Sequence, residues 1–152
     1  MVTGLSGTLL WFSLWTAGGP APVVAPSAGP AQATVVHTAQ APQHVIADGK
    51  GTATMLLGVP EASMTLLTFL PGAAVPEHTH ADSGEFLSLL EGTMEVTVQG
   101  KTTVVTAGDA IHIPAGAVHS ARVVGRFEQA RAVQVYVGPG PEQRFTKGEK
   151  LR

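Results

Sequence analysis

The sequence predicts an all-β domain, built either as a sandwich or as a small antiparallel barrel. Short runs with high strand propensity recur at even spacing, and residues of turn composition separate them. Gly 18 and Pro 11 among 152 residues indicate many turns. No window shows sustained helical periodicity, and no internal repeat is visible. These observations favour a single β domain over a helical bundle.

The predicted strands follow one another with little intervening sequence. Between residues 93 and 98, Met94, Val96 and Val98 alternate with polar residues, which is the period-2 pattern of a strand with one buried face. Glu91-Gly92 is predicted to be a hairpin turn, and Gln99-Gly100 the next turn. Strands are expected at residues 52–57, 63–70, 85–90, 93–98, 101–106, 110–113, 118–124 and 127–137, with Gly125-Arg126 joining the last two.

The first 33 residues differ in composition from the rest. Residues 1–47 contain no Asp, Glu, Lys or Arg, and residues 5–15 form an apolar run of signal-peptide length. Ala31-Gln32-Ala33 offers small residues to a signal peptidase. We therefore expect a signal peptide over residues 1–33, a single domain over residues 34–152, and a periplasmic or secreted protein. No basic residue precedes the apolar run, so the alternative is a low-complexity leader or a misassigned start in a cytoplasmic protein.

Bulk composition excludes several classes of function. The formal net charge is -2 and no basic stripe is present, so no nucleic-acid partner is expected. The apolar run is shorter than the ~20 residues that a bilayer span requires, so no membrane association is expected after cleavage. Cysteine is absent, which excludes disulfides, thiolate metal ligands and cysteine nucleophiles.

Three histidines and one glutamate form a candidate metal site. His78 and His80 are two residues apart, so both side chains can lie on one face of a strand. A small polar turn leads from them to Glu85, and His119 follows a Pro-x-Gly turn. Imidazole and carboxylate ligands without thiolate suit one divalent ion, namely Fe, Mn, Ni, Zn, Co or Cu. Four ligands leave two positions open on a six-coordinate ion, but they saturate a four-coordinate Zn.

This pattern resembles the cupin superfamily in its compact, single-domain bacterial form. The first family motif, G-x5-H-x-H-x4-E-x6-G, is matched from Gly72 to Gly92 with every spacing kept. The second, G-x5-P-x-G-x2-H-x3-N, is matched from Gly108 to His119, with Val123 at the place of the Asn. The resemblance covers about residues 45–138.

The resemblance implies a fold and a ligand set. It implies a small antiparallel β-barrel of the double-stranded β-helix, jelly-roll-like type, often found as a homodimer. It also implies that the metal ligands are His78, His80, Glu85 and His119. Because cupins include dioxygenases, decarboxylases, isomerases, lyases and non-catalytic proteins, the fold does not select a reaction.

Two functions remain open from the sequence. The first is a metal-dependent enzyme, a dioxygenase or a lyase, that acts on a small oxygen-rich molecule and uses Glu85 as a catalytic base. The second is a non-catalytic periplasmic module that binds a small ligand or a metal. Gln129 and Arg131 share a strand face, and we expect Arg131 to be a solvated charge rather than an anion ligand. The candidate pocket walls are Met64, Leu66, Phe69, Phe86, Met94 and Phe127.

The other three histidines are not expected to bind the metal. His112 should face opposite to Ile111 and Ile113, either in a structural role or in contact with a metal ligand. His37 and His44 lie near the expected mature N-terminus and are predicted to be surface residues.

Overall fold

Ten strands and three 3-10 helices form the part of the chain that the computed structural model describes, residues 32–125 and 128–152. The strands are β1 (Gln43–Ile46), β2 (Gly51–Val59), β3 (Ala62–Phe69), β4 (Ala74–His78), β5 (Gly84–Glu91), β6 (Thr93–Val98), β7 (Lys101–Thr106), β8 (Ala110–Ile113), β9 (His119–Val123) and β10 (Ala130–Val137). The helices are η1 (Thr38–Gln40), η2 (Ala47–Gly49) and η3 (Pro141–Lys147). Among the described residues, no helix has the length and apolar character that a membrane crossing needs.

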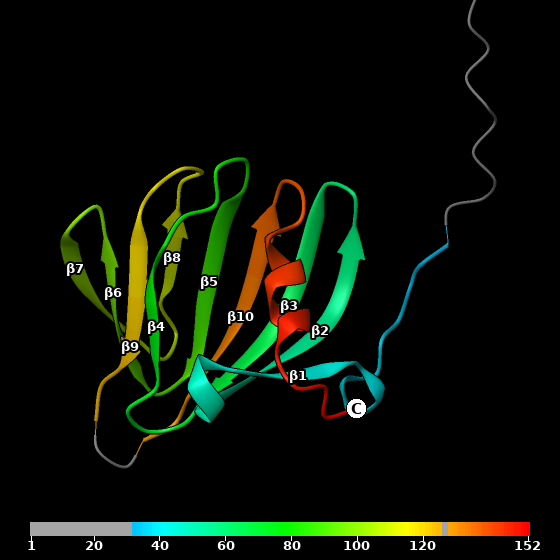
Figure 1. Ribbon diagram of the computed structural model, residues 1–152, viewed down its shortest axis with the longest axis horizontal. Helices are drawn as coiled ribbons and strands as arrows, with labels where there is room; N and C mark the ends of the chain where they lie inside the picture. Colours follow the sequence, from blue (N-terminus) through cyan, green and yellow to red (C-terminus); the bar gives the residue numbers. More distant parts are fainter. Residues whose placement is uncertain (1–31, 126–127) are drawn as a thin grey trace, which may run out of the picture. The chain divides into compact units, whose positions relative to one another are not determined.

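The strands belong to two antiparallel sheets, as Figure 1 shows. Sheet A has the order β1-β2-β3-β10-β5-β8, and sheet B has the order β4-β9-β6-β7. Neither sheet closes on itself, so the domain is an antiparallel jelly-roll-like sandwich with the character of an open barrel. The all-β, jelly-roll-like fold expected from the sequence is confirmed.

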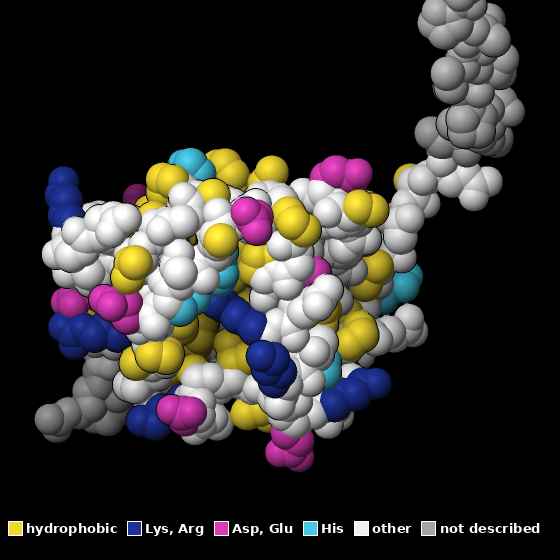
Figure 2. Space-filling model, turned by 45° about the horizontal axis from the view of Figure 1, so that its top comes forward, with side chains coloured by type: hydrophobic (Ala, Val, Ile, Leu, Met, Phe, Trp, Pro, Cys, Tyr) yellow, Lys and Arg dark blue, Asp and Glu magenta, His cyan; other side chains and the backbone are white. Residues whose placement is uncertain are grey.

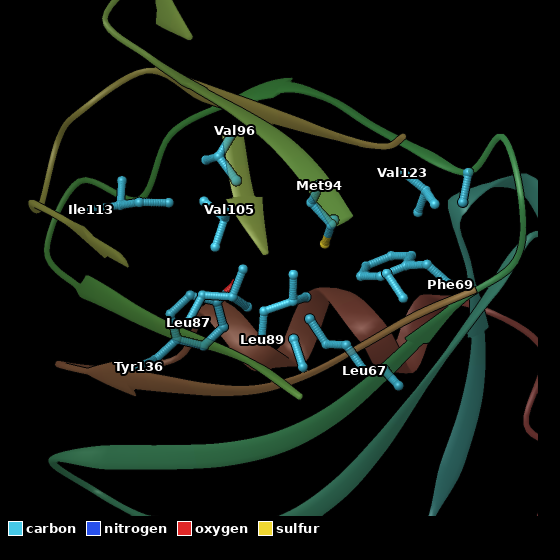
Figure 3. Close-up of a cluster of buried hydrophobic side chains, with 14 of the residues drawn as sticks. Leu67, Phe69, Leu87, Leu89, Met94, Val96, Val105, Ile113, Val123 and Tyr136 are labelled. Carbon is cyan, nitrogen blue, oxygen red and sulfur yellow. The ribbon is translucent and has the colours of Figure 1, made fainter. Parts of the chain in front are cut away.

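The core lies between the two sheets. Figure 3 shows Met94, Val96 and Val105 of sheet B pointing toward Leu87 and Leu89 of sheet A. The alternation predicted for residues 93–98 is confirmed, because Met94 and Val96 are 2% and 1% exposed. Burial of these apolar faces against each other supplies the main driving force for packing the sheets.

The predicted hairpin at Glu91-Gly92 is wrong. Strand β5 belongs to sheet A and β6 to sheet B, so this turn carries the chain across the sandwich. Gly92 has φ of 79°, and a Cβ at this position would lie 2.3 Å from the carbonyl oxygen of Gln129. Only glycine fits such a close approach of two backbones. The turn predicted at Gln99-Gly100 is correct, because β6 pairs with β7.

Two edge strands were given no range in the prediction from sequence; a strand was expected only around His78 and His80, and β4 ends at His78. Strand β4 is mostly exposed and contains Pro76, which an edge strand tolerates because it needs no hydrogen bond on its outer side. Strand β1 has only four residues. Helix η3 was also missed; its Phe145 joins the core.

The expected leader lies almost wholly outside the described residues. Its apolar run and Ala31 of its proposed cleavage site belong to residues 1–31, so export and the division at residues 33 and 34 stay predictions.

Candidate metal centre

The folded chain brings together the four candidate ligands. His78 ends β4, His119 begins β9, and the two residues are directly paired across sheet B. Glu85 lies on β5 of sheet A, and His80 lies on the connection between β4 and β5. One potential ligand atom from each residue lies within 4.8 Å of the others. The cluster therefore spans both sheets.

Backbone contacts orient two of the histidine rings. His78 Nδ1 lies 2.8 Å from the carbonyl oxygen of Pro76, and His119 Nδ1 lies 2.8 Å from that of Ala117. Because a carbonyl oxygen only accepts, Nδ1 of each ring carries the proton, and in the neutral ring Nε2 holds a lone pair. Such backbone contacts are typical of histidines that bind metal through Nε2.

Several buried atoms in the cluster lack a hydrogen-bond partner within the described residues. They are Nε2 of His78, Nε2 of His119, Oε2 of Glu85 and Oε1 of Gln134. Buried polar atoms are normally satisfied, because an unsatisfied one costs about 1–3 kcal/mol. The first three atoms carry lone pairs that can bind a divalent ion, so the residues present fit a metal ion chemically.

Glu85 is held in place as a carboxylate. Its Oε1 accepts a 2.6 Å hydrogen bond from the Gln134 amide, and its Oε2 lies 3.4 Å from His80 Nε2 and 3.3 Å from His119 Nε2. Burial raises the pKa of Glu85, but contacts with His119, His80 and Gln134 outweigh burial and hold that pKa well below its usual range. The carboxylate therefore stays charged, as a metal ligand must.

The histidines differ in their tendency to take up a proton. Burial is the main cause that lowers the pKa of His78, to about 4. Burial also acts to lower the pKa of His119, but contact with Glu85 outweighs it and raises that pKa. At neutral pH the His78 ring is therefore uncharged, and its Nε2 can bind an ion. His119 retains a second ring proton more readily.

Gln134 positions Glu85, and its replacement tests this role. We expect Gln134→Leu to lower metal affinity about 10- to 100-fold, because residues that hydrogen-bond a ligand fix its orientation. The measurement is metal titration of the purified protein against a competing chelator.

Gln129→Leu is the matched control for Gln134→Leu. The exposed Gln129 amide donates to Glu91 at 3.2 Å, so the same type of Gln–Glu contact is removed away from the cluster. Wild-type affinity in Gln134→Leu, or an equal loss in both variants, contradicts the positioning role.

A cavity of about 360 Å³ opens onto the cluster. His78, Glu85 and His119 form part of its wall, together with Gln134 and Arg144. The other walls are apolar and include Leu67, Phe69, Leu87, Met94, Val96 and Ile113. Figure 2 shows a hollow in which cyan histidine and dark-blue basic side chains stand beside yellow apolar ones. A small molecule can therefore approach the cluster from an apolar chamber.

Three residues at the site were missed by sequence reasoning. Gln134 and Tyr136 point inward from β10, and Arg144 reaches the cluster from η3. For Gln134 and Tyr136 the available signal was the alternation of Ala130 and Ala132 with larger residues. Small side chains fit a crowded interior, so this alternation indicated which face of β10 is inward. No sequence signal pointed to Arg144, because η3 follows the last strand and has no repeating pattern.

Several expected wall residues lie elsewhere. Phe69 and Met94 line the cavity as expected, whereas Met64 and Leu66 belong to the opposite face of β3, and Phe86 is 47% exposed. Phe127 lies outside the described residues. The prediction that Arg131 is a solvated charge is correct, because it pairs with Glu91 at 2.6 Å on the outer face.

The remaining histidines lie away from the cluster. His112 is exposed and stacks on Phe86, with ring centroids 4.5 Å apart. His37 is exposed as predicted. The prediction that His44 is a surface residue is wrong, because it is 7% exposed and its Nδ1 approaches the carbonyl oxygen of Gly148 at 3.5 Å. Docking of the C-terminal segment on β1 covers it, and β1 itself was not predicted.

Comparisons with known proteins indicate the family to which the fold is related. Residues 65–136 match the model of the family described as "Cupin domain". The chain is 34% identical over 79 residues to quercetin 2,3-dioxygenase from Bacillus subtilis, a match that covers 52% of this chain and 22% of that protein. It is 36% identical over 77 residues to "Polyketide synthase CurC" from Streptomyces cyaneus, covering 51% of this chain and 49% of that protein. The matches thus span less than half the length of these curated relatives.

A solved structure shares the fold. The chain superposes on an RmlC-like cupin from Shewanella frigidimarina with a TM-score of 0.65 and 22% identity. The superposition covers 74% of this chain and 96% of that one.

Proposed function

This chain belongs to the cupin superfamily, and we propose that it is a metal-dependent enzyme that acts on a small oxygen-rich molecule, as an oxygenase or a lyase. The observation that carries the proposal is the convergence of three imidazole nitrogens and one carboxylate oxygen in a cluster of which His78, Glu85 and His119 line a largely apolar cavity. A purely structural metal site is usually closed, whereas a catalytic one keeps a position open to substrate. The relationship to a quercetin 2,3-dioxygenase supports the oxygenase branch.

In this proposal His78, His80, Glu85 and His119 hold one divalent ion. The ion supplies Lewis acidity toward substrate oxygen atoms or activates dioxygen. The chain's own contribution is to orient the ligands through Pro76, Ala117 and Gln134 and to exclude water from the apolar chamber.

Glu85 is also the proposed catalytic base. Its lowered pKa makes it a weak proton acceptor while Gln134 and the two histidines contact it. A proton transfer to Glu85 would therefore require that its carboxylate leave the ion and these contacts during turnover.

The pH dependence of metal binding tests the ligand set. A proton on His119 Nε2 competes with the ion, and the raised pKa of His119 places this competition above the ordinary histidine value of about 6.5. Above the raised pKa no proton needs to be displaced, and below it one does. We expect metal affinity to be constant at high pH and to fall about tenfold for each pH unit below that pKa. A chelator competition series from pH 8 to pH 5 measures this, and a flat profile contradicts the prediction.

A substrate screen of the metal-loaded protein, under air and under nitrogen, tests the reaction class. Oxygen consumption coupled to product supports an oxygenase, and turnover that persists under nitrogen supports a lyase. Tight ligand binding without turnover favours the alternative, a non-catalytic periplasmic binding module. Assembly as a homodimer also stays a prediction, and equilibrium sedimentation tests it.

A further inference from the structure

Arg144 lies at the metal cluster without belonging to it. Its Nη2 donates a 2.7 Å hydrogen bond to the Tyr136 hydroxyl, and its Nη1 lies 3.4 Å from His80 Nε2. Its guanidinium carbon is 5.0 Å from the centre of the Phe145 ring. These contacts hold the half-buried guanidinium in the cavity wall, beside the candidate ligands.

The charge of Arg144 has no acidic partner among the described residues. Arg122 pairs with Glu95, and Arg131 pairs with Glu91, but no ion pair in the described part of the chain includes Arg144. A guanidinium offers five N–H donors, and among the described residues only two atoms accept from it. Partial burial of an unpaired charge costs free energy, and an anionic ligand that supplies the counter-charge would offset this cost.

The charge balance of the cavity favours an anion. Glu85 is the only carboxylate among the described residues that form the wall. A divalent ion bound by Glu85 leaves one net positive charge, and Arg144 adds a second. In a largely apolar chamber such an excess attracts an anionic ligand more strongly than it does in water.

Metal binding by His80 would also free part of Arg144. The His80 Nε2 lone pair that now faces Nη1 is the one that a metal ion would take, so the two contacts exclude each other at this nitrogen. The Nη1 N–H groups of Arg144, a residue of the cavity wall, would then be without this partner. A planar guanidinium binds a carboxylate with two parallel hydrogen bonds.

We propose that Arg144 binds the carboxylate of a small, mostly apolar organic acid, which is the ligand class of this cavity. This proposal rests on the proposed metal function, because the metal supplies the charge excess and frees the guanidinium. The apolar walls suit an apolar body of the acid, and a cavity of about 360 Å³ lies at the small end of the range for small-molecule sites.

Calorimetric titration of the metal-loaded protein with benzoate and with uncharged benzamide tests the proposal. The wild type should bind benzoate more tightly than benzamide. Arg144→Gln should lose about tenfold or more in benzoate affinity, as expected for a charge-assisted contact, and less than twofold in benzamide affinity.

Lys147→Gln is the matched control, because it removes the same charge from an exposed position on η3. It should leave both affinities unchanged. Equal benzoate affinity in the wild type and Arg144→Gln, or equal losses in both variants, overturns the proposal.

Measurement of the metal content distinguishes failure of the Arg144 proposal from failure of the proposed metal function. About one metal ion per chain in both variants, with no selective loss of benzoate, overturns the role of Arg144 and leaves the metal function intact. Absence of bound metal from the wild type overturns the proposed function itself.

Discussion

Replacement of His78 by Ala should lower metal affinity by more than about 100-fold, the largest effect that we expect at the site. Loss of a residue that only orients a ligand already costs 10- to 100-fold, and removal of a ligand costs more. His78 is half-buried at the end of an edge strand, so the change should leave the fold intact. Elemental analysis and chelator competition measure the effect, and circular dichroism checks the fold.

His112→Ala is the matched control for His78→Ala. His112 is exposed and stacks on Phe86, so its loss should leave the metal content unchanged. Unchanged metal content in His78→Ala, or a large loss in His112→Ala, would overturn the assignment of ligands.

Replacement of Leu89 by Ala should reduce the free energy of unfolding by about 3 kcal/mol. Leu89 is 1% exposed and points between the two sheets, as Figure 3 shows. The cost combines the lost transfer of the side chain out of water with the cavity left in a close-packed interior. Urea unfolding followed by circular dichroism measures it.

The next residue, Leu90, provides the control. It lies on the same strand but faces outward and is 47% exposed, so Leu90→Ala should change stability by no more than about 0.5 kcal/mol. Similar losses in both variants would show that the burial pattern of β5 is not as described.

Strands with strong alternation were predictable from the sequence, whereas the edge strands β1 and β4 were not. The pattern of Met94, Val96 and Val98 reports a single buried face, which is a local property. The identity of a strand's partner is not local, and Glu91-Gly92 shows this, because a tight glycine turn joins two strands of one sheet or, as here, two sheets.

Strand faces were ambiguous where both sides carry apolar residues. On β10, Val133 and Val135 suggest an inward face, yet Ala132 and Gln134 occupy the interior. Crowding between the sheets favours small side chains at those positions, and only the packed structure reveals this crowding. The same ambiguity misplaced Met64 and Leu66 on β3.

The candidate ligands were visible because their chemistry is concentrated in two short motifs. The residues that support them were not visible, because Gln134 and Arg144 come from separate later segments and contact the cluster only through the fold. Sequence motifs therefore indicate the atoms that bind an ion, whereas the surrounding cavity depends on topology.

The placement of the cluster across both sheets has a consequence for unfolding. His78 and His119 belong to sheet B, and Glu85 and its partner Gln134 to sheet A, so one ion would tether the two layers together. An ion that binds only the folded chain stabilises it by about 2.7 kcal/mol at a hundred times its dissociation constant. The heat resistance of this protein should thus track the supply of metal in its surroundings, and scarcity would leave the two layers joined by apolar packing and the connecting loops.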